Sequence, residues 1–169
     1  MQTESQTQNL SEALNIKKPM NIHVILSRSY SIYFFAFIIG LVIDSILSSK
    51  FNIKLGGENL SAIGFILLIL ATFLMYWAQS VNSKTRYLPD GSKDFTAGPY
   101  KYSRNPTQMG LFILVLGAGF MMNSYIICVG AILALTFSTL YVIPMEEARH
   151  IRKHGDAYLS YMKKVRRLI

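Results

Sequence analysis

The segment that decides the fold is GLFILVLGAGFMMNSYIICVGAILALTFSTLYVI, residues Gly110–Ile143. It is apolar except near Asn123 and Ser124, and as a helix it is too long for one crossing of a hydrocarbon core about 30 Å thick. A helical hairpin with its turn at Asn123 and Ser124 is therefore predicted. Its first arm, Leu111–Met122, rises only about 18 Å as a helix, so we expect it to slant or to lie partly inside protein.

Two further apolar segments precede this hairpin, Ser29–Leu47 and Leu60–Ala78. Each spans about 28 Å as a helix, which matches the hydrocarbon thickness. The chain is 51% hydrophobic and only 15% charged, too few charges for an ordinary soluble surface. These features predict an all-α polytopic membrane protein with four transmembrane helices. Residues 1–28 are expected to form a polar, interfacial segment, and residues 29–169 a single membrane domain.

Positive charge is distributed unevenly between the predicted helices. The formal net charge is +8, and if the four helices alternate in direction, 15 of the 17 Lys and Arg lie on one face. By the positive-inside rule, both termini and the 82–109 loop are cytoplasmic. We interpret the basic residues as contacts for anionic lipid headgroups rather than nucleic acid. A bacterial inner membrane is the expected location, and no obligate protein partner is inferred.

Two polar segments, 82–109 and 144–169, share the predicted cytoplasmic face. The first contains GPYKYSRNPTQMG, Gly98–Gly110, in which two prolines and two glycines restrict the backbone. Restriction lowers the entropy lost when a loop closes on a ligand, although a surface loop with interfacial tyrosines explains the same composition. In the second segment, Pro144 is expected to end or kink the last span, and Gly155 to end the next helix.

Several residues have competing interpretations. Glu146 and Glu147 suit a helix N-terminus, or would hold a cationic ligand at the membrane border. Glu146 and His154 lie about 12 Å apart along a helix, so no metal site is predicted. Asp44 is a functional candidate by its depth, but we expect it to reach water, Ser45 or Ser48. Cys128 is the single cysteine, which excludes an internal disulfide framework.

Taken in order, GPYKYSRNPTQMG, the hairpin and EEARHIRKHGDAYLSYMKKVRRLI resemble the isoprenylcysteine carboxyl methyltransferase family and its bacterial relatives. That family has a Gly-x-Tyr-x-x-x-Arg-His/Asn-Pro segment, then a hydrophobic hairpin, then Glu-Glu. A Gly-x-x-Tyr-x-x-Tyr pattern follows, and here Gly155, Tyr158 and Tyr161 match it. The resemblance covers about residues 90–168 of the sequence printed above.

The resemblance implies an integral membrane methyltransferase that takes S-adenosylmethionine from the cytoplasm and a hydrophobic or lipid-like acceptor from the bilayer. It implies a carboxylate on the amino group of the cofactor and an aromatic ring on its adenine or sulfonium. Arg104 and Asn105 are the implied catalytic residues. The implied cofactor-binding residues are Ser92, Lys93, Asp94, Phe95, Tyr100, Asn105, Pro106, Thr107, Gln108 and Glu146; the substrate residues are unknown.

Three positions depart from the family pattern. Asn105 stands where many relatives have histidine, so it offers hydrogen bonds but no general base. Gln108 replaces a common tyrosine, and Val142 replaces an arginine of the relatives that methylate a prenylcysteine carboxylate. That acceptor is therefore disfavoured, and a thiol, amine or phenol stays open. The alternatives are a non-catalytic membrane protein that keeps the fold and a membrane reductase that uses NADPH.

Overall fold

The computed structural model describes residues 22–51, 56, 59–83 and 95–168. This part of the chain is helical and contains no named strand, which confirms the all-α prediction. The helices are α2 (Ile22–Phe51), α3 (Asn59–Ser83), the short 3₁₀ helix η1 (Gly98–Lys101), α4 (Pro106–Met121), α5 (Tyr125–Phe137), the π-helical turn η2 (Ser138–Val142), α6 (Ile143–His154) and α7 (Asp156–Lys164).

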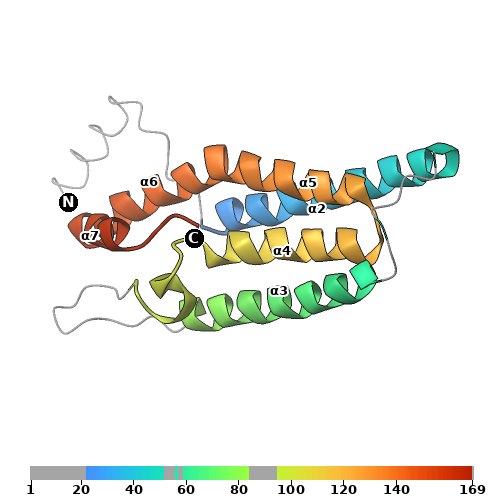
Figure 1. Ribbon diagram of the computed structural model, residues 1–169. Helices are drawn as coiled ribbons and strands as arrows, with labels where there is room; N and C mark the ends of the chain where they lie inside the picture. Colours follow the sequence, from blue (N-terminus) through green and yellow to red (C-terminus); the bar gives the residue numbers. More distant parts are fainter. Residues whose placement is uncertain (1–21, 52–55, 57–58, 84–94, 169) are drawn as a thin grey trace, which may run out of the picture.

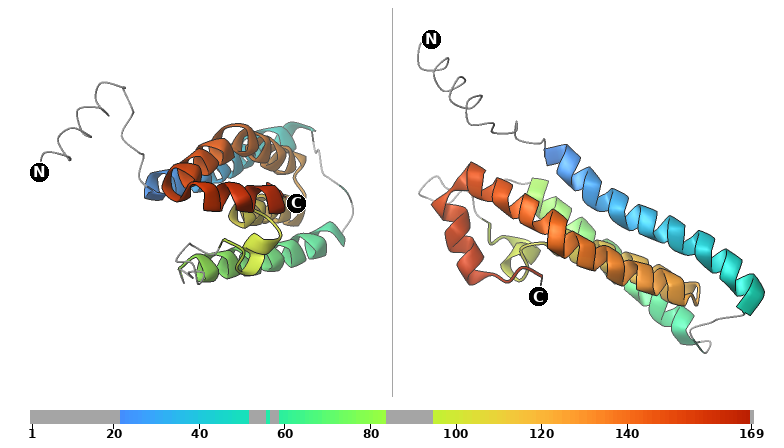
Figure 2. Two further views of the ribbon diagram at one scale, coloured as in Figure 1. Left: turned by 90° about the vertical axis from the view of Figure 1, so that its left-hand side faces the viewer. Right: turned by 90° about the horizontal axis from the view of Figure 1, so that it is seen from above.

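Helix α4 lies in the middle of the bundle (Figure 1). It packs against α3 on one side and against α5 on the other, while α2 packs mainly on α5. Figure 2 shows that α5, η2 and α6 form one long rod, and that α7 folds back beside the end of α6. This arrangement brings α6, α7 and the start of α4 to the same end of the molecule.

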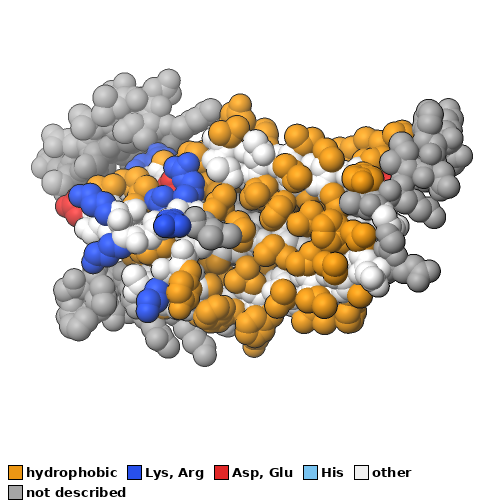
Figure 3. Space-filling model, in the orientation of Figure 1, with side chains coloured by type: hydrophobic (Ala, Val, Ile, Leu, Met, Phe, Trp, Pro, Cys, Tyr) orange, Lys and Arg blue, Asp and Glu red, His pale blue; other side chains and the backbone are white. Residues whose placement is uncertain are grey.

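Three helical segments of the described chain are long and apolar enough to cross a membrane: Ser29–Leu47, Asn59–Val81 and Tyr125–His154. Helix α4 is apolar but shorter, and its 16 residues rise about 24 Å. It begins at Pro106, before the apolar arm that starts at Leu111, because proline is favoured at the first position of a helix. Apolar side chains cover most of the surface that Figure 3 presents, so the chain is an integral membrane protein.

Small residues allow α3 and α4 to approach closely. A Cβ added to Gly64 of α3 would lie 2.5 Å from the backbone nitrogen of Met121 and 2.7 Å from the carbonyl oxygen of Gly117. Between helices surrounded by lipid, such close backbone approach replaces the hydrophobic drive that stabilises soluble proteins. The glycines of α4 therefore act as packing residues, and α4 is fixed against the long helix α3.

The hairpin turn is where the sequence predicted it, at Asn123 and Ser124. Asn123 has a φ of 56°, and its side-chain amide pairs with both the N–H and the C=O of Gly56. The Ser124 hydroxyl donates to the Asp44 carboxylate, a partner on another helix that the sequence did not predict, and the expected reach of Asp44 to water, Ser45 or Ser48 stays a prediction. The tertiary fold places the hairpin turn beside α2, and we call these residues (Asp44, Gly56, Asn123 and Ser124) the far end.

Of the two effects expected of Pro144, an end or a kink in the last span, the end does not occur. The Tyr125–His154 segment continues through Pro144, and the helix widens to a π turn at Ser138–Val142, with the Ile143 N–H bonded to the Ser138 carbonyl. A π turn bonds residues five apart instead of four, which accommodates a residue without an N–H. Helix α6 does end at His154, because Gly155 takes a φ of 54°.

The described part of α2 begins at Ile22, before the expected start of the span at Ser29. Residues 1–21 lie outside the described chain, so the division at residue 28 stays a prediction. The Lys and Arg side chains in Figure 3 gather at the end of the bundle that carries α6 and α7. We call this end, with Arg104, Gln108, Glu146, Glu147 and Arg167, the basic end.

Candidate functional site

The loop before α4 and the C-terminal tail meet at the basic end. Ser103 and Arg166 form an isolated parallel bridge, and the Arg104 N–H donates to the Arg166 carbonyl at 3.0 Å. The Asn105 side-chain amide donates to the Arg167 carbonyl at 3.0 Å. Segments more than sixty residues apart in the sequence are thus joined by backbone contacts, and the predicted convergence of loop and tail is present.

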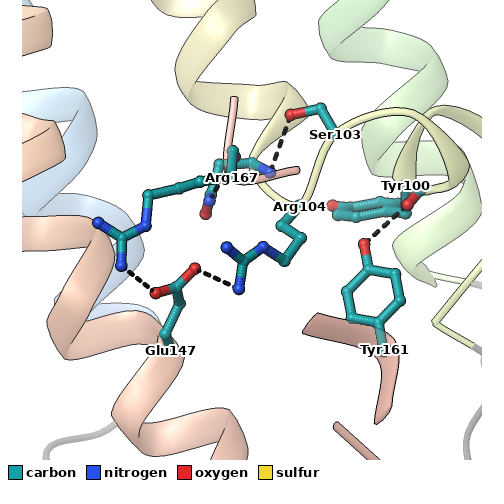
Figure 4. Close-up of polar contacts among 7 residues, drawn as sticks. Tyr100, Ser103, Arg104, Glu147, Tyr161 and Arg167 are labelled. Carbon is teal, nitrogen blue, oxygen red and sulfur yellow. Dashed lines mark hydrogen bonds and ion pairs between the residues drawn. The ribbon is translucent and has the colours of Figure 1, made fainter. Parts of the chain in front are cut away.

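A buried carboxylate links the same two segments. One oxygen of Glu147 forms an ion pair with Arg104 at 3.0 Å, and the other accepts a hydrogen bond from Arg167 at 2.8 Å, as Figure 4 shows. The side chains of Glu147 and Arg104 are only 5% and 10% exposed. Removing one member of such a buried pair leaves an uncompensated charge, which is strongly destabilising. The ion pairs therefore fix α6, the loop and the tail relative to one another.

Aromatic rings pack beside this ion pair. The Tyr161 hydroxyl donates to the Tyr100 carbonyl at 2.7 Å (Figure 4). Phe95 stacks on Tyr161 with centroids 5.5 Å apart and contacts the edge of His154, and His150 stacks on Tyr158. The two histidines of α6 thus belong to an aromatic cluster that holds α7 in place.

Burial perturbs the phenols of this cluster. It raises the pKa of Tyr158 to about 12 and also raises the pKa of Tyr161 above its ordinary value. The pKa of Tyr100 is likewise raised by burial, with the negative charge of Glu146 adding to the effect and a hydrogen bond from Thr107 opposing it. These tyrosines stay neutral at physiological pH, so they act as hydrogen-bonding and stacking groups rather than as bases.

A second polar chain links three helices. The Gln108 amide donates to the Ser29 hydroxyl at 2.6 Å, and Ser29 donates to Glu146 at 3.3 Å. Tyr100 lies within electrostatic range of Glu146 and bonds the Thr107 side chain. The residues predicted from the loop and those predicted from α6 therefore occupy one neighbourhood, with α2 contributing Ser29.

Buried polar atoms at the basic end remain without a partner. Gln108 is 3% exposed, and among the described residues its Oε1 accepts no hydrogen bond; the buried Nε of Arg104 likewise has no hydrogen-bond partner there. Native proteins satisfy almost all buried polar atoms, so each exception requires an explanation. A bound ligand would supply the missing partners, so this end is the candidate binding site.

The structure thus separates the sequence-predicted residues into groups. Gln108 and Glu146 are linked through Ser29, and Tyr100 lies within hydrogen-bonding range of Thr107 and electrostatic range of Glu146. Arg104 and Asn105 hold the tail, Pro106 begins α4, and Phe95 lies in the aromatic cluster. Ser92, Lys93 and Asp94 lie outside the described residues. The catalytic role of Arg104 and Asn105 and the cofactor contacts stay predictions.

Three residues of the site were not predicted from sequence: Ser29, Glu147 and Arg167. Ser29 gave no signal, because it begins an apolar span far from both polar segments. Glu147 was recognised as half of an acidic pair, but spacing alone did not show which carboxylate faces the arginine. Arg167 was one of several basic tail residues without a distinguishing pattern.

These observations define a helical membrane protein with a buried polar site at the end of its bundle. The phospholipid methyltransferase family model matches residues 60–156, more than half of the chain. The chain therefore belongs to the phospholipid methyltransferase family, and it is a membrane-associated methyltransferase. Comparisons with curated proteins and with solved structures find no match. The matched segment includes η1 but does not include α2, and it ends at the first residue of α7.

Proposed function

We propose that the chain transfers a methyl group from S-adenosylmethionine to a hydrophobic or lipid-like acceptor, in the manner of the isoprenylcysteine carboxyl methyltransferase branch. The observation that carries this proposal is the hydrogen-bonded chain from Gln108 of α4 through Ser29 to Glu146 of α6, with the buried Oε1 of Gln108 unpartnered among the described residues and Tyr100 within electrostatic range of Glu146. The family match supports methyl transfer, and the resemblance of the two polar motifs supports the choice of cofactor.

The residues present fit the cofactor. Its ammonium group requires acceptors, which the Glu146 carboxylate and Gln108 Oε1 offer, and Tyr100 provides an aromatic ring for a cationic or planar group. When bound, the cofactor supplies an electrophilic methyl group on a sulfonium. Displacement of that methyl needs no metal and no covalent enzyme intermediate, so the task of the protein is to align the two reactants and exclude water.

The position of the site favours an acceptor that reaches it from the membrane. The third span, Tyr125–His154, includes α6 with Glu146, and Gln108 lies in the first turn of the apolar helix α4. The site lies between these two helices. A lipid-like acceptor would place its tail among the apolar helices and its reactive group among the polar residues. Val142, buried in the π turn, offers no charge to a carboxylate, which favours an amine, thiol or phenol over a prenylcysteine carboxylate.

We further propose that the basic end faces the cytoplasm, where the cofactor is available. The positive-inside rule supports this orientation, as does the gathering of Lys and Arg at that end. Anionic headgroups would then lie beside the site.

The test is calorimetric titration of the purified full chain in nanodiscs with S-adenosylhomocysteine. Tyr100→Ala and Glu146→Ala should each weaken binding at least tenfold, since each removes a group that contacts the ligand. Tyr102→Ala is the matched control, because Tyr102 is 69% exposed and should leave affinity unchanged. A well-folded protein that binds no S-adenosylhomocysteine would overturn the proposal and favour a non-catalytic role. Transfer of labelled methyl to a lipid extract would then identify the acceptor class.

A further inference from the structure

Ser29 connects the two halves of the candidate site. Its hydroxyl is the donor to Glu146 Oε1 at 3.3 Å and the acceptor of the Gln108 amide at 2.6 Å. It is 3% exposed and comes from α2, which lies outside the segment that the family match covers. One hydroxyl therefore sets the orientation of side chains from two other helices.

This connection fixes which atom of the Gln108 amide faces away from Ser29. A hydroxyl has a single proton, and the Ser29 proton is directed to the Glu146 carboxylate. Ser29 then accepts from Gln108, which agrees with the structure, where the NH₂ group of the amide faces Ser29. The carbonyl oxygen, Oε1, is left on the other side, where it has no partner.

An unpartnered hydrogen-bond acceptor favours ligands that carry a hydrogen-bond donor. A buried carbonyl oxygen gains most from an N–H or O–H donor, and it repels another acceptor such as a carboxylate oxygen. A site built to hydrogen-bond a ligand donor rejects a close analogue without it far more strongly than an apolar pocket rejects a missing methylene. The nearby Glu146 carboxylate and Tyr100 ring also favour a donor or a cation.

We propose that Ser29 is a positioning residue that holds Gln108 Oε1 toward the ligand, and that the site selects a ligand with an N–H or O–H donor at this point. The proposal rests on the proposed function for the identity of the ligands. Two sources share this chemistry: the ammonium of the methyl donor, and an amine or hydroxyl of the methyl acceptor.

The experiment uses the full chain in phosphatidylcholine nanodiscs and two independent titrations. The first measures the affinity for S-adenosylhomocysteine. The second compares dodecylamine with dodecyltrimethylammonium, which share the charge and the tail but differ in N–H donors. Ser29→Ala, Gln108→Met and the control Ser45→Ala, an exposed serine of the same helix, are measured beside the unmodified chain.

If the methyl donor supplies the hydrogen bond, Ser29→Ala and Gln108→Met lower the affinity for S-adenosylhomocysteine about tenfold. If the acceptor supplies it, both variants keep that affinity but lose a preference of about tenfold for dodecylamine. In either case Gln108→Met should leave the melting temperature of the ligand-free protein roughly unchanged, because the lost hydrogen bond to Ser29 is offset by removal of a buried unbonded oxygen. A purely structural role would lower the melting temperature and leave both titrations unchanged.

The proposal is overturned if both variants keep the affinity and the amine preference within about twofold of the unmodified chain. It is also overturned if the unmodified chain shows no amine preference and the variants bind S-adenosylhomocysteine normally. Failure of the proposed function gives a different result, since the unmodified chain itself would then bind no S-adenosylhomocysteine. The amphiphile titration still tests Ser29 and Gln108 in that case.

Discussion

The two ends of the helical bundle use polar residues differently. At the far end, Asn123 bonds both backbone groups of Gly56, and Ser124 bonds Asp44. No buried side-chain atom of these residues lacks a partner in the described structure. At the basic end, Gln108 Oε1 and Arg104 Nε are buried without one. In a purely structural contact the buried polar atoms are all hydrogen-bonded within the protein, whereas in a binding site some of them are left to bond the ligand.

The difference between the two ends indicates which polar residues of a small membrane protein have a function beyond stability. Polar residues in contact with lipid are costly, so a chain retains them either to fix a turn or to bind something. The two roles are distinguished by whether each buried polar atom has a hydrogen-bond partner, and not by how polar a region is. Three substitutions test this difference between the two ends.

The largest effect is expected from Glu147→Ala at the basic end. It leaves the Arg104 guanidinium buried without a counter-charge and frees Arg167, so the free energy of unfolding should fall by about 3–5 kcal/mol. Unfolding in mixed micelles, followed by circular dichroism, measures the change. Asp156→Ala, an exposed acid in the first turn of α7, should cost less than about 1 kcal/mol. A loss below about 1 kcal/mol for Glu147→Ala would show that the ion pairs do not hold the tail.

A smaller effect is expected from Ser124→Ala at the far end. Ser124 donates to Asp44 and caps α5 through the Ile127 N–H. Losing both bonds should cost about 2 kcal/mol in the same unfolding measurement. The affinity for S-adenosylhomocysteine should stay unchanged, because the far end has only a structural role. A tenfold weaker affinity in a folded Ser124→Ala variant would contradict the contrast between the two ends.

The smallest effect is expected from Arg167→Gln. Its side chain is 42% exposed, so water and salt screen the pair with Glu147, and the loss should stay below about 1 kcal/mol. Raising the salt concentration should shrink the difference further. The adjacent Arg166→Gln is the control, since Arg166 contributes its backbone carbonyl to the bridge with Arg104. A salt-independent loss above about 2 kcal/mol would indicate that Arg167 is as buried in the membrane as Glu147.

Particular residues show how far sequence reasoning reaches. Hydropathy and length predicted the spans and the hairpin turn at Asn123, because lipid forces each apolar segment into a self-satisfied helix. Local rules predicted the end of α6 at Gly155, since a positive φ favours glycine. Local reasoning left two outcomes open at Pro144, an end or a kink, and did not predict the π turn that precedes it at Ser138–Val142.

The helices, their apolar surfaces and the two polar segments follow from the amino-acid sequence, because they depend on composition and on contacts between near neighbours. The pairing of Arg104 with Glu147 rather than Glu146, and the bond of Ser29 to Gln108, became visible only in the folded chain. Those choices depend on how α2, α4, α6 and the tail pack. The physical reason is that a hydrogen bond or ion pair selects its partner by a distance of about 3 Å, which no spacing along the chain specifies.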